Sequence, residues 1–129
     1  MKTEKLNEIL KIVEHKVTMD LEWRSWSDSS VEAAFDWLLD EIEEAKEELV
    51  AKKKVYLEDE LCDVVWTIFR IIEILDRDNS VDKSRIFDRV IKKYSQRVYW
   101  LEEWKKWNDI KKVQKVELLE EQTNLENNK

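Results

Sequence analysis

The sequence contains no glycine and no proline among its 129 residues, and this absence bears directly on the fold class. Sheets with tight hairpins, glycine-rich phosphate loops and left-handed helix caps all depend on such residues. The chain is instead rich in Glu, Lys, Leu, Arg and Ile, which favour helix. We therefore predict an all-α protein, built as an antiparallel bundle of four main helices.

Cysteine and histidine are almost absent, with one copy of each at Cys62 and His15. A single cysteine excludes an intramolecular disulfide and makes a reducing, cytoplasmic setting the default expectation. A single histidine excludes a zinc site with several histidine ligands, and we expect His15 on a helix surface. Hydrolytic chemistry in this chain would have to rest on carboxylates with a hard metal ion.

Basic residues are fewer than acidic ones, 23 Lys and Arg against 30 Asp and Glu, so the formal net charge is −7. A polyanion has no reason to bind nucleic acid or an anionic membrane surface, so we expect neither partner. No apolar run approaches the roughly 20 residues that span a bilayer. The first residues, MKTEKLNEIL, are charged and amphipathic, unlike a signal peptide. An anionic substrate would need a bridging cation or a local basic patch.

Apolar periodicity defines four expected helices. The second begins with a capping box of Ser29 and Glu32 and ends near residue 51, before a short turn of three lysines. That short connection makes the second and third helices antiparallel neighbours. The expected helices cover about residues 4–19, 31–51, 57–75 and 81 to beyond Trp107. We expect one domain over residues 1–113 and a frayed or disordered tail over 114–129.

The stretch WLLDEIEEAKEEL, residues 37–49, holds six acidic residues in thirteen positions. On a helical wheel of about 100° per residue, Asp40, Glu43 and Glu47 point to solvent, whereas Glu41, Glu44 and Glu48 line one flank of the apolar stripe. In the third helix, Glu60 and Asp63 line the flank that lies on the same angular side of the apolar stripe as Glu41 and Glu44 do in the second helix. Glu41, Glu44, Glu60 and Asp63 should therefore converge between the two antiparallel helices.

Such convergence is unfavourable without a counterion, because like charges repel and partial burial removes hydration. All-oxygen ligation without histidine or cysteine suits Mg²⁺ or Mn²⁺. The alternative is that these acids are ordinary flanking charges of amphipathic helices. That alternative explains any single pair of acids better than it explains two pairs on matching flanks.

Glu41-Ile-Glu-Glu44 followed by Glu60-Leu-Cys-Asp63 resembles the E-x-x-E…E-x-x-D signature of the MazG-type all-α nucleoside triphosphate pyrophosphohydrolases. The wider match includes VIKKYSQRVYW, residues 90–100, and the resemblance covers about residues 23–100. It implies a dimeric or tetrameric four-helix bundle that hydrolyses a nucleoside triphosphate to monophosphate and pyrophosphate. It also implies Mg²⁺, or Mn²⁺ in its place, held by the four acids. Cys62 stands where the family often has glycine.

The same resemblance suggests substrate contacts. Lys93 and Arg97 match a basic pair that contacts phosphates in this family, and their i, i+4 spacing places them on one face. Lys54 lies near a family lysine but is not aligned with it. Trp37 shares the acidic flank and is our candidate for stacking on a nucleobase, with Trp23 and Trp26 as possible pocket walls. Trp100, Trp104 and Trp107 are better explained by packing than by base stacking.

Three functions remain open from the sequence. The first is a Mg²⁺-dependent pyrophosphohydrolase acting on an NTP or dNTP. The second is a relative with a narrower substrate, such as a dUTPase or a phosphoribosyl-ATP pyrophosphohydrolase. The third is a non-catalytic helical module that dimerises through its apolar faces. In every case we expect a homodimer or homotetramer.

Overall fold

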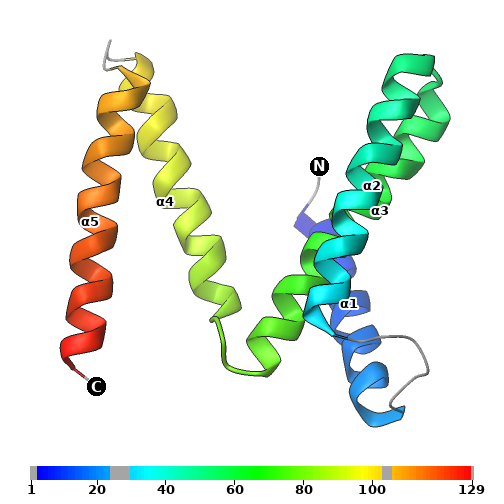
Figure 1. The fold of residues 1–129 in the computed structure, drawn as a ribbon, viewed down its shortest axis with the longest axis horizontal. Helices are drawn as coiled ribbons and strands as arrows, with labels where there is room; N and C mark the ends of the chain where they lie inside the picture. Colours follow the sequence, from blue (N-terminus) through cyan, green and yellow to red (C-terminus); the bar gives the residue numbers. More distant parts are fainter. Residues whose placement is uncertain (1–2, 24–29, 103–105, 129) are drawn as a thin grey trace. The chain divides into compact units, whose positions relative to one another are not determined.

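The computed structural model describes residues 3–23, 30–102 and 106–128, and within them the chain forms five helices and no strand (Figure 1). The predicted all-α class is confirmed. The helices are α1 (Thr3–Trp23), α2 (Val31–Ala51), α3 (Lys54–Arg77), α4 (Lys83–Glu102) and α5 (Trp107–Asn127).

The expected count of four helices is wrong, because the last predicted helix is two. Helix α4 ends at Glu102, and α5 begins at Trp107 after Lys106, whose backbone is extended at φ −75° and ψ 136°. The residues around this break are good helix formers without glycine or proline, so no local signal marks it. Helix α5 runs through Asn127. The fraying expected for residues 114–129 in solution stays a prediction.

Two other predicted boundaries are corrected. Ser30, not Ser29, caps α2, and its side-chain oxygen accepts a hydrogen bond from the Ala33 amide at 3.1 Å. Ser29 lies outside the described residues. The first helix, expected to end near residue 19, instead continues to Trp23. Asp20 stays helical because it is buried and paired with Arg70 of α3.

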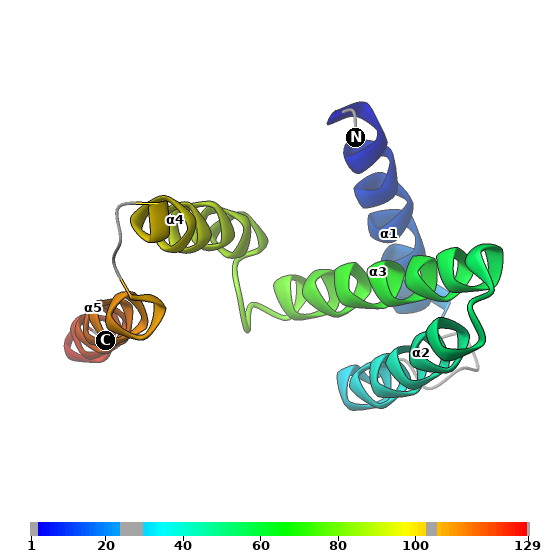
Figure 2. The same ribbon diagram turned by 90° about the horizontal axis from the view of Figure 1, so that it is seen from above.

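The turn between α2 and α3 fixes how these helices pair. Lys52 adopts a left-handed conformation at φ 57°, and α3 begins two residues later. Such a short connection reverses the direction of the chain, so α2 and α3 are antiparallel neighbours. The two helices lie side by side in both views (Figures 1 and 2). Helix α1 packs against α3. The apolar core of residues 1–83 contains Val13, Val17, Ala34, Ala45 and Ile71.

Residues 84–129 form a second compact unit. It consists of most of α4, together with α5. Side chains bridge the two helices, and their backbones do not pack closely. The described helices include none that is long and apolar enough to cross a bilayer.

Candidate metal centre

The antiparallel pairing of α2 and α3 brings acidic side chains from both helices together. Glu41 of α2 and Glu60 and Asp63 of α3 each offer a carboxylate oxygen, and these three oxygens lie within 4.8 Å of one another. All three residues are partly buried. The helical wheels predict this convergence, and the short α2–α3 turn makes it possible by aligning the two flanks.

Glu44, the fourth predicted acid, lies one turn after Glu41 and is hydrogen-bonded to both Glu41 and Glu60. Burial is the largest cause that raises the pKa of Glu41 from its ordinary 4.5 to about 7, and the charge and hydrogen bonding of Glu44 come next. Burial and the hydrogen bond to Glu44 also raise the pKa of Glu60. Asp63 adds repulsion to both. The neighbouring acids therefore make it harder for Glu41 and Glu60 to ionise.

Two carboxylate oxygens at this centre lack hydrogen-bond donors among the described residues. Oε2 of Glu41 and Oε2 of Glu60 are buried, and no described group donates a hydrogen bond to either. Glu44 can donate only while it is protonated. Buried acceptors without donors are costly, and a hard divalent cation satisfies several carboxylate oxygens at once. The residues present therefore fit a divalent cation.

The neighbouring acids lie where the wheels place them. Asp40, Glu43 and Glu47 on α2 are exposed, and Glu43 forms an exposed ion pair with Lys46 at 3.5 Å. Glu48 is different, because it lies on the flank of Glu41 and its Oε2 is buried without a described donor. Its i+7 spacing from Glu41 was the signal for it in the sequence, although we did not include it in the predicted site.

Beside the acids, Trp37 meets a residue that the sequence analysis missed. The Arg70 guanidinium lies over the Trp37 ring, 5.1 Å from its centroid, and Trp37 as a residue remains 40% exposed. Arg70 also pairs with Asp20 of α1 at 3.7 Å. A charged residue within the apolar run VVWTIFRII, two turns after Asp63, was the available signal.

The predicted basic residues lie elsewhere. Lys54 is the exposed first residue of α3. Lys93 and Arg97 lie on α4, where Lys93 is exposed and Arg97 is buried against α5. Of the other tryptophans, Trp107 stacks on Arg97 at 5.1 Å. Trp26 and Trp104 lie outside the described residues.

Fold and cluster together define the class: an all-α protein in which two antiparallel helices gather carboxylates able to hold a divalent cation. The family model described as the MazG nucleotide pyrophosphohydrolase domain matches residues 29–101, more than half of the chain. The chain belongs to this family, as the acidic signature indicates. Searches of curated proteins and of solved structures gave no match. The family match covers α2, α3 and nearly all of α4, and it leaves α1 and α5 outside.

Proposed function

We propose that this chain is a Mg²⁺-dependent nucleoside triphosphate pyrophosphohydrolase, which converts an NTP or dNTP to the monophosphate and pyrophosphate. One observation carries the proposal: within the family match, the buried Oε2 atoms of Glu41 and Glu60 have no described donor beside two further acids. An acidic helix face that served only solubility would keep its carboxylates hydrated.

Glu41, Glu44, Glu60 and Asp63 are the proposed metal ligands, with Mn²⁺ as a possible substitute. When bound, the cation would supply charge neutralisation at the phosphates and would make water more acidic. One glutamate of the set would orient or deprotonate the attacking water, and the remaining acids would hold the centre in place.

Four further residues are proposed to contact the substrate. Lys93 and Arg97 bind phosphates, which is supported by their common face on α4. Trp37 stacks on the nucleobase, which is supported by its half-exposed ring one turn before Glu41. The contact proposed for Lys54 is supported by its exposure at the start of α3.

Product analysis tests the reaction. The full chain with Mg²⁺ is incubated with the eight common NTPs and dNTPs, dUTP and phosphoribosyl-ATP, and pyrophosphate is measured separately from inorganic phosphate. We expect pyrophosphate as the primary product, and turnover of dUTP or phosphoribosyl-ATP alone would identify the narrower relatives. Primary release of single phosphate would overturn the proposal.

The non-catalytic interaction module is supported by the many exposed apolar side chains on the described helices. Melting experiments separate it from the enzyme without the right substrate. A cation bound only by the folded chain stabilises it by about 2.7 kcal/mol at one hundred times Kd, so Mg²⁺ or Mn²⁺ should raise Tm by several degrees. Monovalent salt at matched ionic strength should do less. Replacing Glu60 with Gln and Asp63 with Asn should remove the divalent effect, and a wild type without that effect would favour the interaction module.

A further inference from the structure

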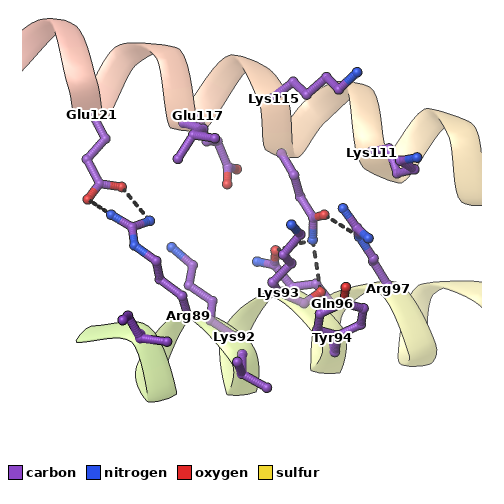
Figure 3. Close-up of a pocket in the computed structure, with 14 residues that line it drawn as sticks. Arg89, Lys92, Lys93, Tyr94, Gln96, Arg97, Lys111, Lys115, Glu117 and Glu121 are labelled. Carbon is purple, nitrogen blue, oxygen red and sulfur yellow. Dashed lines mark hydrogen bonds and ion pairs between the residues drawn. The ribbon is translucent and has the colours of Figure 1, made fainter. Parts of the chain in front are cut away.

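A basic cleft of about 660 Å³ lies between α4 and α5 (Figure 3). Its size suits a small ligand. Six basic side chains line it, against two carboxylates, Glu117 and Glu121. The basic residues are Arg89, Lys92, Lys93, Arg97, Lys111 and Lys115. Residues 84–129 carry 11 Lys and Arg against 8 Asp and Glu, in a chain whose net charge is −7. The cleft thus concentrates positive charge in an acidic protein.

The two ends of this cleft differ in charge balance. At one end, Arg89 donates to both oxygens of Glu121, and this hydrogen bonding lowers the pKa of that carboxyl (Figure 3). At the other end, no described carboxylate forms an ion pair with Lys93, Arg97 or Lys111. The unbalanced positive charge therefore lies at the end that contains Arg97.

Arg97 is only 8% exposed. Its guanidinium lies 5.1 Å from the ring centroids of both Tyr94 and Trp107. Its Nε donates to Oε1 of Gln114 at 2.7 Å, and no described acceptor is recorded for its two terminal nitrogens. Within the described residues no carboxylate pairs with this guanidinium, and its fork geometry matches phosphate oxygens.

Helix α5 fixes this arrangement. The Gln114 amide donates to the Lys93 carbonyl at 3.0 Å and to Oε1 of Gln96 at 3.2 Å, in addition to accepting from Arg97. Both polar atoms of the Gln114 side chain are thereby hydrogen-bonded to α4. A neutral amide at this position orients Arg97 and leaves its positive charge uncompensated. A glutamate at the same position would neutralise that charge.

We propose that the α4–α5 cleft binds the linked phosphate groups of a nucleotide or of pyrophosphate, and that α5 takes part in this binding. Lys111 adds a phosphate contact, and Gln114 and Trp107 are positioning residues for Arg97. The inference rests on the proposed function for its ligand class. It extends the phosphate-binding surface to α5, which lies outside the family match.

Calorimetric titration tests the proposal. Sodium pyrophosphate is added to the full-length chain in EDTA, so that no divalent cation takes part. We expect saturable binding that sulfate at equal ionic strength does not reproduce. Gln114→Glu is nearly isosteric and pairs with Arg97, so it should abolish binding while the fold is retained. Lys111→Gln should weaken binding about tenfold, as expected for loss of one charge-assisted contact.

Lys112 provides the matched control, because it is the adjacent lysine of α5, is exposed and does not line the cleft. Lys112→Gln should leave the pyrophosphate affinity unchanged. No binding by the wild type would overturn the proposal, as would equal losses in the Lys111 and Lys112 variants. If Gln114→Glu fails to fold by circular dichroism, the Lys111 and Lys112 comparison still decides the question.

Inhibition kinetics identify the source of the phosphates. Competitive inhibition of NTP hydrolysis by pyrophosphate, with a higher KM in Lys111→Gln, would assign the cleft to the substrate's own phosphates. A fall in kcat at constant KM would assign it to a second phosphate ligand, and both results support the cleft. The proposed function can fail separately: binding in EDTA without Mg²⁺-dependent pyrophosphate release would retain the cleft and reject the reaction. Mg²⁺-dependent release of pyrophosphate by a chain that does not bind pyrophosphate in EDTA would retain the reaction and reject the cleft.

Discussion

The carboxyl group of Glu41 links the acidic cluster to stability. Its pKa in the folded chain is raised from 4.5 to about 7, mainly by burial and then by Glu44. An acid with a raised folded pKa binds its proton more tightly in the native state than in the unfolded state. The free energy of unfolding therefore falls as pH rises between these two values.

We predict that the metal-free protein loses thermal stability as pH rises from about 4.5 to about 7. Thermal melts in EDTA at half-unit pH intervals measure this loss. Glu41→Gln should flatten the profile in that window, and Glu43→Gln, on the exposed face, should leave it unchanged. A wild-type Tm that rose steadily through the window would contradict the raised pKa.

The acidic residues of α2 and α3 should also differ in their importance for the reaction. Glu41→Gln and Glu60→Gln should abolish Mg²⁺-dependent turnover, because each removes a charged oxygen from the proposed metal site. Glu43→Gln and Glu47→Gln should change kcat/KM less than about twofold, since both side chains are exposed. Steady-state kinetics measure the four variants. Equal damage from Glu43→Gln and Glu41→Gln would show that the cluster is not the reactive centre.

At the scale of the helices, Arg70 joins α1, α2 and α3. It is 5% exposed, pairs with the 7% exposed Asp20 of α1, and stacks on Trp37 of α2. A buried ion pair adds little net stability over a well-packed apolar pair. Removal of one partner is nevertheless severe, because the other charge stays buried.

Asp20→Ala should therefore lower the free energy of unfolding by about 3 kcal/mol. Urea unfolding followed by circular dichroism measures the change. The control is Lys46→Ala, which breaks the exposed ion pair to Glu43 and should cost under about 1 kcal/mol. Equal effects of the two substitutions would mean that α1 is not held to α3 through this pair.

At the scale of the whole molecule, α4 carries an exposed apolar stripe. Ile91, Tyr94, Val98 and Leu101 follow the 3, 4, 3 spacing of one helix face, and each is more than 40% exposed. Apolar surfaces of this kind mark sites of association. They support the homodimer or homotetramer that we propose on the family resemblance.

We predict at least a dimer at micromolar concentration in Mg²⁺, and size-exclusion chromatography with light scattering measures the mass. Ile91→Glu should shift that mass toward the monomer, because it places a charge in the apolar stripe. The control, Lys112→Glu, changes an exposed lysine of α5 and should leave the mass unaltered. A monomeric wild type would contradict the predicted assembly.

The sequence by itself determined the helical class and the phase of each helix, because propensity and apolar periodicity are local properties. It also determined the convergence of Glu41, Glu60 and Asp63. A short turn leaves α2 and α3 one way to pair, so two wheel phases were enough to align their flanks.

The tertiary structure decided the rest. The separation of α4 from α5 has no glycine or proline to mark it, so the sequence pattern continued through it. The contact of Gln114 with Arg97, 17 residues apart, depends on how α5 is placed against α4. The meeting of Asp20, Trp37 and Arg70 likewise depends on how α1 packs against α3. Such contacts follow from the register between helices, which residues distant in sequence set together and no local pattern encodes.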